Sequence, residues 1–258
     1  MRKARLIAWS VLIEAVRRRE IYVIVAVSVI LLGAVLGMDF FRMEGLTKFY
    51  LEICLKIMSM ATALTVITLS CRQLPREFKD RTIYPLLAKP VGRGTFLAGK
   101  LAGVLMAAVF CFALFMAVFV AGSLATGLGV PWTHFAQFLY LQMLMMGVLA
   151  SLGFLLSLVM NMDAAITMSV IFYLTANIFT TGLSYIYEFV GRVERAFLVV
   201  MNYALPQLTL FDFSEKTVHA ETWGPLGAGT LAVLTVYALF FIAVYFGLSL
   251  ILFRRRAL

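Results

Sequence analysis

Long apolar runs without a charged residue constrain the fold of this chain more than any other feature of its sequence. Residues 21–38, 101–122 and 231–253 contain no Asp, Glu, Lys or Arg. An apolar run of about 18 residues or more is long enough to cross a bilayer as a helix. The chain is 63% hydrophobic and 14% charged, whereas soluble domains are about 45–50% apolar and about 25% charged. An ordinary soluble enzyme is therefore excluded, and a multi-pass membrane protein is predicted.

Three further apolar runs, at residues 53–71, 135–160 and 164–187, bring the predicted number of transmembrane helices to six. All six prolines fall outside these spans, as expected where a helix in lipid must satisfy its own backbone hydrogen bonds. The sequence therefore predicts an all-α, polytopic membrane protein. Residues 1–258 form a single transmembrane domain in this interpretation, because too little chain remains for a second folded domain of ordinary size.

Residues 1–20 predict an amphipathic helix before the first span. Leu6, Trp9, Ile13 and Val16 recur at helical spacing, and most of the charged residues fall elsewhere on the helix. A basic amphipathic helix with a tryptophan is typical of a helix that lies in the membrane interface. We therefore expect this segment to lie on the membrane surface rather than to cross it.

The basic residues are distributed unevenly between the predicted loops, and this sets the orientation. Residues 1–20 hold six Lys and Arg, residues 72–100 hold seven and the C-terminal tail holds three, so one side carries sixteen. The other side carries five, and one lysine within a span completes the 22. Because cytosolic loops are enriched in Lys and Arg, both termini are predicted to be cytosolic. The net charge of +9 is explained in this way, and no nucleic-acid partner is predicted.

The predicted cytosolic segment 72–100 is more elaborate than a topology signal requires. Pro75 can open a short helix, in which Glu77 and Arg81 form a pair four residues apart. One face of this helix carries Phe78, Thr82 and Leu86. Two more prolines, at 85 and 90, end it.

The start of the third span carries two further signals. Thr95 is expected to cap its N-terminus. Gly99 and Gly103 have the G-x-x-x-G spacing that permits another helix to approach closely, and we expect such a helix to pack there.

The run that ends at Lys100 resembles the coupling segment of ABC-2 type transporter permeases. In that family a Glu, a Thr, a Leu pair, a Pro, an Arg and a Gly-Lys lie between the second and third spans. This chain departs from the pattern at Arg81, where the family more usually has Gly. The resemblance covers the whole chain and is closest to permeases of the multi-copper enzyme maturation and gliding motility type. The matching residues are Glu77, Thr82, Leu86, Leu87, Pro90, Arg93, Gly99 and Lys100.

The resemblance implies the permease subunit of an ATP-driven ABC transporter, an exporter, in the bacterial cytoplasmic (inner) membrane. Its partners would be a separate ABC ATP-binding subunit, a second copy of the permease in a homodimer, and membrane lipid. ATP and Mg would be held by the ATPase subunit, and this chain would bind no cofactor. Asp163 is either a second contact with the ATPase or a cap of the fifth span, and the cap is the simpler interpretation. The residues expected to contact the ATPase are Glu77, Phe78, Arg81, Thr82, Leu86, Leu87, Lys89, Pro90, Arg93 and Asp163.

No catalytic residue, nucleotide site or metal site is predicted in this chain. The stretch 94–100 matches G-x-x-x-x-G-K, but Leu101 follows where a P-loop needs Ser or Thr for magnesium. The chain has fourteen methionines, which are more simply explained as side chains that fill space within the spans than as ligands for copper. No His or Cys lies at a spacing that would complete a copper site. Cys54, Cys71 and Cys111 are expected to be buried small residues.

Polar residues within the fifth span are the predicted translocation path or dimer interface. Asn177, Thr181 and Ser184 recur at helical spacing, and polar groups at this depth usually face a bundle interior or a cavity. The Ser and Thr hydroxyls could instead bond to their own helix. Residues 188–230 form a long outer segment, for which we expect one or two short helices at the membrane surface.

Two other functions fit the same architecture. A secondary transporter or channel would work without an ATPase, but such proteins usually carry buried ionisable residues or broken helices. A membrane anchor or assembly factor would bind a client that is not an ATPase. The proteins that co-purify with the chain distinguish these alternatives.

Overall fold

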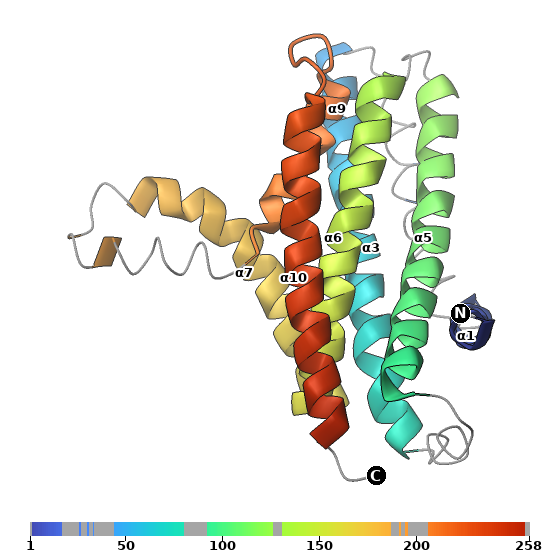
Figure 1. The fold of residues 1–258 in the computed structure, drawn as a ribbon. Helices are drawn as coiled ribbons and strands as arrows, with labels where there is room; N and C mark the ends of the chain where they lie inside the picture. Colours follow the sequence, from blue (N-terminus) through green and yellow to red (C-terminus); the bar gives the residue numbers. More distant parts are fainter. Residues whose placement is uncertain are drawn as a thin grey trace.

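The computed structural model is helical throughout its described elements, with no strand in the part of the chain that it describes (Figure 1). Their order is α1 (Arg2–Val16), α3 (Glu44–Lys79), α5 (Arg93–Ala125), α6 (Trp132–Val159), α7 (Met162–Ile186), the 3-10 helix η2 (Leu208–Phe211), α9 (Ser214–Val218) and α10 (Ala228–Arg255). The described residues are 2–16, 26, 30, 33, 44–79, 92–125, 131–186, 191, 194, 195 and 206–255.

Four of the described helices are long and apolar enough to cross a membrane, namely Glu52–Lys79 of α3, Arg93–Ala121 of α5, Trp132–Val159 of α6 and the whole of α10. They coincide with the second, third, fourth and sixth predicted spans. Helix α7 covers the fifth, and its residues Met162–Ala176 form an apolar helix. Most of the first predicted span lies outside the described residues. Six spans therefore stay a prediction.

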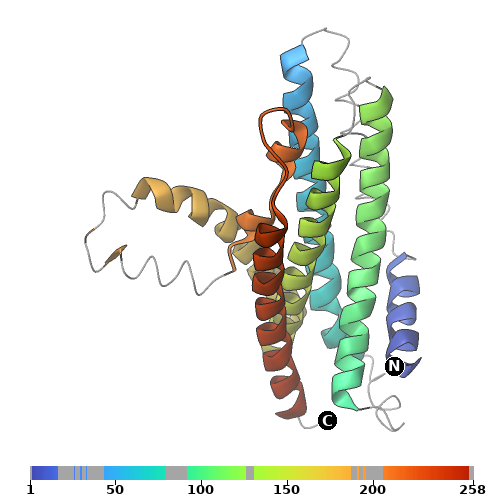
Figure 2. The same cartoon turned by 45° about the horizontal axis from the view of Figure 1, so that its top comes forward.

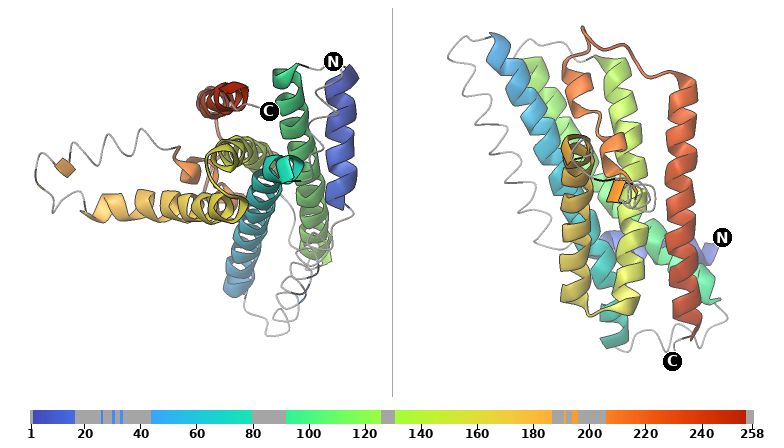
Figure 3. Two further views of the ribbon diagram at one scale, coloured as in Figure 1. Left: turned by 90° about the horizontal axis from the view of Figure 1, so that it is seen from below. Right: turned by 90° about the vertical axis from the view of Figure 1, so that its left-hand side faces the viewer.

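Helix α6 is the centre of the bundle, with α3, α7 and α10 packed around it (Figure 3). Two glycines of α6 permit this close packing. A Cβ atom at Gly153 would lie 2.1 Å from Oγ of Ser70 on α3, and one at Gly147 would lie 2.8 Å from Cδ1 of Ile242 on α10. Small residues allow helix backbones to approach where lipid offers no hydrophobic driving force.

The cysteines take part in the core as small buried residues. Cys54, Cys71 and Cys111 are all buried and free of disulfide bonds. The thiol of Cys71 lies 3.7 Å from the carbonyl oxygen of Gly153, at the close contact between α3 and α6. The predicted burial of the three cysteines is confirmed.

Helix α3 continues through Pro75 to Lys79, so the prediction that Pro75 opens a separate helix is wrong. An internal proline removes one backbone hydrogen bond and costs about 3 kcal/mol or more in an isolated helix. Here Gln73 and Leu74 beside it are buried in the bundle, and this packing holds the helix through the proline.

The predicted cap of the third span is also wrong. Helix α5 begins at Arg93, so Thr95 lies within its first turn rather than at its cap. The amide of Phe96 donates to the carbonyl oxygen of Gly92 at 3.0 Å. This bond starts the helix three residues earlier than the sequence suggested.

Helix α1 lies across one end of the bundle instead of running along it. It is seen nearly end-on in Figure 1 and packs beside the first half of α5 (Figure 2). Helices α3 and α10 finish at this same end of the bundle, and α5 begins there. We call it the C-terminal end.

Candidate functional site

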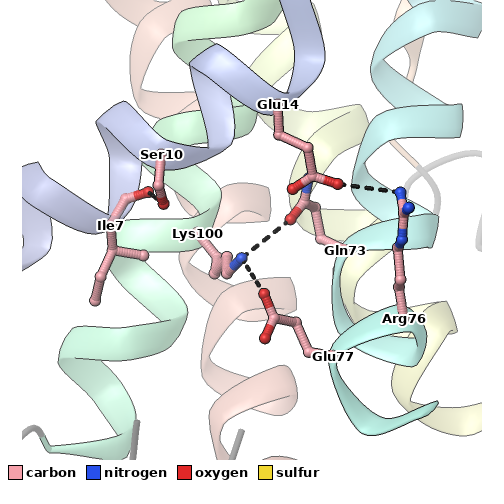
Figure 4. A network of polar contacts seen from close by, with 7 residues as sticks. All are labelled: Ile7, Ser10, Glu14, Gln73, Arg76, Glu77 and Lys100. Carbon is pink, nitrogen blue, oxygen red and sulfur yellow. Dashed lines mark hydrogen bonds and ion pairs between the residues drawn. The ribbon is translucent and has the colours of Figure 1, made fainter. Parts of the chain in front are cut away.

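A network of charged and polar side chains joins three helices at the C-terminal end, and we call it the polar junction (Figure 4). Lys100 of α5 lies at its centre, with its Nζ 2.5 Å from Oε1 of Glu77 and 3.3 Å from Oε1 of Gln73. Arg76 of α3 donates to Oε1 of Glu14 on α1 at 3.1 Å. The junction consists of Glu14, Gln73, Arg76, Glu77 and Lys100.

Helix α1 is held on α5 by a face of small residues. Ala8, Val11 and Ala15 are buried. A Cβ atom at Gly103 would lie 2.6 Å from Cβ of Val11 and 2.8 Å from the carbonyl oxygen of Ala8. The close helix contact predicted from the glycine spacing is therefore confirmed at Gly103, and the helix that packs there is α1.

The opposite side of α1 carries large apolar side chains that no other described element covers. Leu6, Trp9 and Ile13 are exposed and lie at the spacing that places residues on one helical face. This exposed row agrees with the apolar face predicted from the sequence, and the position of α1 in the membrane interface stays a prediction.

Aromatic rings connect the end of α10 to the same region. The ring of Phe253 on α10 lies 6.2 Å from that of Phe78 on α3 and 6.0 Å from that of Phe96 on α5, measured between centroids. The guanidinium of Arg93 donates to the carbonyl oxygen of Arg254 at 2.8 Å. The C-terminal ends of α3 and α10 and the start of α5 are therefore in mutual contact.

The predicted ATPase contacts are only partly within the described residues. Glu77, Phe78 and Arg93 lie at the C-terminal end, where α3 finishes and α5 begins, and Asp163 lies on the first turn of α7. Glu77 was expected to pair with Arg81, and the structure places it against Lys100. The remaining predicted contacts, Arg81, Thr82, Leu86, Leu87, Lys89 and Pro90, lie outside the described residues.

Asp163 is not the cap of α7, so the simpler interpretation of this residue is wrong. The helix begins at Met162 and the amide of Ala165 donates to the carbonyl oxygen of Asn161 at 2.8 Å. Asp163 instead lies exposed in the first turn, where a negative charge interacts favourably with the helix dipole.

The three polar residues predicted for the path, Asn177, Thr181 and Ser184, lie on α7, in the half that projects sideways from the bundle (Figures 1 and 3). Their side chains lie outside the described part of the structure. The bundle interior instead contains Gln142 of α6, which donates to the carbonyl oxygen of Ser59 at 3.4 Å. The predicted path did not include Gln142, although an amide side chain in an otherwise apolar run is a signal that the sequence carries.

Residues 206–227, which contain η2 and α9, form a strap that packs against α3, α6 and α7 and runs to the other end of the bundle (Figure 1). The side-chain amide of Gln137 on α6 donates to the carbonyl oxygen of Leu226 and accepts from its amide, both at 3.0 Å. Nε2 of His134 lies 2.9 Å from the carbonyl oxygen of Trp223, and its ring stacks on Phe213. Short helices in the second half of the segment 188–230 are confirmed.

Charged contacts attach the strap to α3. Lys48 donates to the exposed carboxylate of Glu221 at 2.8 Å and thereby lowers the pKa of that carboxyl below its ordinary value. Nε2 of His219 lies 3.6 Å from Oε2 of Glu52. Because the Glu221 pKa is lowered by folding, the ion pair stabilises the strap at neutral pH and is lost as the pH falls through the folded-state pKa.

Replacing Gln137 with Leu is expected to loosen the strap. The change leaves the amide and the carbonyl of Leu226 without their side-chain partner, at a cost of roughly 1–3 kcal/mol. Trypsin should then cleave after Lys216 several times faster in membrane vesicles that expose this end. Tyr140→Phe is the matched control, because it removes only the exposed hydroxyl contact with Thr235. Equal cleavage rates in both variants would show that the amide does not hold the strap.

Comparison with known protein families decides the class of this protein. The family model for ABC-2 family transporter proteins matches residues 6–258, nearly the whole chain. The chain belongs to the ABC-2 transporter family. No individual curated protein matches it in sequence.

Membership in this family indicates the role of the membrane-spanning helices. An ABC-2 transporter protein with several membrane-spanning helices is a multi-pass membrane protein and the permease component of an ABC transporter. It is also expected to associate with an ABC ATP-binding subunit. The polar junction of this ABC-2 permease lies at the two helix ends that flank residues 80–91, which include six of the ten predicted ATPase contacts.

Proposed function

We propose that this ABC-2 permease couples ATP hydrolysis by a separate ATPase subunit to the movement of a substrate across the membrane. The observation that carries the proposal is the family match over residues 6–258, which includes the segment between α3 and α5. This chain supplies the path and the contact surface and has no nucleotide site of its own. Export is the direction that the family resemblance implies, and two permease copies would form the conduit. The finer resemblance, to permeases of multi-copper enzyme maturation and gliding motility, stays a prediction.

We propose further that the C-terminal end of the bundle faces the cytosol of a bacterial cell, across its inner membrane. The uneven distribution of Lys and Arg supports this orientation. The exposed row of Leu6, Trp9 and Ile13 on α1 also supports it, because this row would lie in the cytosolic interface while the charged side chains of α1 face water. Both termini are cytosolic in this arrangement.

Co-purification tests the proposed function. The permease is expressed with an ABC ATP-binding subunit from the same organism, and the complex is reconstituted in lipid. The complex should hydrolyse ATP, whereas the permease alone should not. A variant of the ATPase that binds but does not hydrolyse ATP should assemble equally well without turnover. If the permease co-purifies with a protein that is not an ATPase, or with none, the proposal is wrong.

Reporter fusions test the orientation. Fusions after Arg93 and after Arg256 should report a cytosolic location, and fusions after Thr126 and Lys216 should report the outside. The physical reason is that loops rich in Lys and Arg are retained in the cytosol. Alkaline phosphatase, which is active only outside, and green fluorescent protein, which is fluorescent inside, give opposite signals at each site. A cytosolic signal at Lys216 would overturn the six-span topology.

A further inference from the structure

Lys100 is the most completely buried ammonium group among the described residues. Its side chain is only 5% exposed, and that of its partner Glu77 is 16% exposed. Lysines are almost never fully buried unless they are paired, because removing an ammonium group from water is costly. Two oxygen acceptors, from Glu77 and Gln73, and the ring of Phe96 at 6.0 Å surround this one. The Lys100–Glu77 ion pair is therefore part of the packed structure at the C-terminal end rather than a contact on the protein surface.

The positions of Glu77 and Lys100 in the chain show which two helix ends the ion pair connects. Glu77 lies two residues before the end of α3, and Lys100 lies in the second turn of α5. The ion pair thus closes the base of the segment that leaves α3 and returns to α5. Arg76, next to Glu77, binds Glu14 and extends the connection to α1 (Figure 4).

We propose that Lys100 is a positioning residue that locks the ends of α3 and α5 together, so that a push on the segment between them moves both helices, and α1 with them, as one unit. The inference rests on the proposed function, because the push would come from the ATPase subunit. Lys100 touches neither ATP nor the substrate, and it acts through the helices that it connects.

The chemistry of the contact explains why an ion pair is suited to this task. Apolar contacts are non-directional, so helices joined only by them can slide past one another at little cost. Separating a hydrogen-bonded charge pair in a poorly hydrated site leaves two unsatisfied charges. The Lys100–Glu77 pair therefore resists sliding of α5 against α3 at the end of the bundle where the ATPase subunit would push. Phe253 packs against Phe78 and Phe96 of the same two helices and adds contact area without fixing their register.

Double electron–electron resonance on the permease–ATPase complex in lipid tests the proposal. The three native cysteines are buried, so spin labels attach selectively to cysteines introduced at exposed positions. Labels at Lys79 and Thr95 report on the locked base, and labels at Leu124 and Gly224 report on the far end of the bundle. The key variant is Lys100→Met with Glu77→Gln, which removes both charges and leaves neither partner as an unpaired ion.

The wild-type complex should give a narrow distance distribution at the base that ATP leaves unchanged, and an ATP-dependent shift at the far end. The double variant should assemble with the ATPase and keep the KM for ATP within about twofold. It should also broaden the distribution at the base and lose at least half of the shift at the far end. The exchanged pair, Lys100→Glu with Glu77→Lys, should restore both signals. Such rescue would show that the charge pair itself, rather than either side chain alone, holds the base.

The control removes an ion pair at the other end of the bundle. Lys56→Met should leave both distance signals as in the wild type, because the side chain of Lys56 is 46% exposed and its ion pair with Glu52 joins residues of the same helix. A double variant at Lys100 and Glu77 that keeps a narrow base and a full far-end shift would overturn the inference while leaving the proposed function intact. A wild-type permease that binds no ATPase would instead overturn the proposed function. The distances at Lys79 and Thr95 on the permease alone would then still decide whether Lys100 locks the two helices.

Discussion

Gly103→Leu is expected to detach α1 from the bundle and to give the largest loss of stability of any single substitution proposed for this protein. Even the first added carbon would lie 2.6 Å from Cβ of Val11 and 2.8 Å from the carbonyl oxygen of Ala8. The backbone of α1 must move to admit the side chain, and overpacking of this kind typically costs about 1–3 kcal/mol, occasionally more. The yield of folded protein after detergent extraction, and its thermal unfolding temperature, should both fall.

Gly247→Leu is the matched control, because a side chain at Gly247 on α10 would meet no atom within 4 Å. It makes the same change of residue in another membrane-spanning helix and should leave yield and unfolding temperature nearly unchanged. If Gly103→Leu behaves like Gly247→Leu, the packing of α1 on α5 is wrong.

Phe78→Ala combined with Leu86→Ala is expected to separate the permease from its ATPase. Both residues belong to the predicted apolar face of the coupling segment, and Phe78 lies half-buried at the end of α3. Truncating a well-buried anchor at a protein interface commonly costs more than about 2 kcal/mol, which corresponds to roughly 30-fold in affinity. The ATPase should therefore be lost during purification, or ATP hydrolysis should no longer respond to the permease.

The contact between Phe78 and Phe253 makes a control necessary, because Phe78→Ala also removes packing inside the permease. Leu86→Ala alone should weaken ATPase binding in the same direction. Phe240→Ala, which truncates an exposed ring on α10, should leave binding unchanged. The amount of permease in the membrane is measured for every variant. A double variant with normal complex and normal activity would remove the coupling role assigned to these two residues.

The predicted spans agree closely with the long helices because both depend on the same local property. Residues 101–122 and 231–253 carry no charge, and an uncharged apolar run of this length has few alternatives to a transmembrane helix. The errors lie where local signals compete with packing. Pro75 and Thr95 indicated boundaries that burial of neighbouring residues overrode, and Asp163 lies two positions after the cap position of α7, which is Asn161.

The candidate site was predicted in outline, but the contact between Glu77 and Lys100 was not predicted. Glu77 was expected to pair with Arg81 because the two are four residues apart, which is all that a single helix can suggest. Arg81 lies outside the described residues, so that pair stays a prediction, whereas Lys100, the partner that the structure shows, is separated from Glu77 by the whole segment between α3 and α5. Lys100 is only 4% exposed. Its place beside an apolar run does not predict this burial, because a lysine in such a place usually extends its ammonium group to the aqueous interface.

The sequence by itself determined that the chain is a multi-pass helical membrane protein, where most of its spans lie, and which segment resembles a coupling element. These follow from hydropathy, charge distribution and motif spacing, which act over short stretches of chain. Only the tertiary structure decided that Gly103 receives α1 and that Lys100 joins α3 to α5. It also decided that Gln137 holds the strap. Each of these contacts joins residues far apart in sequence, and its energy depends on burial and geometry that exist only once the helices have packed.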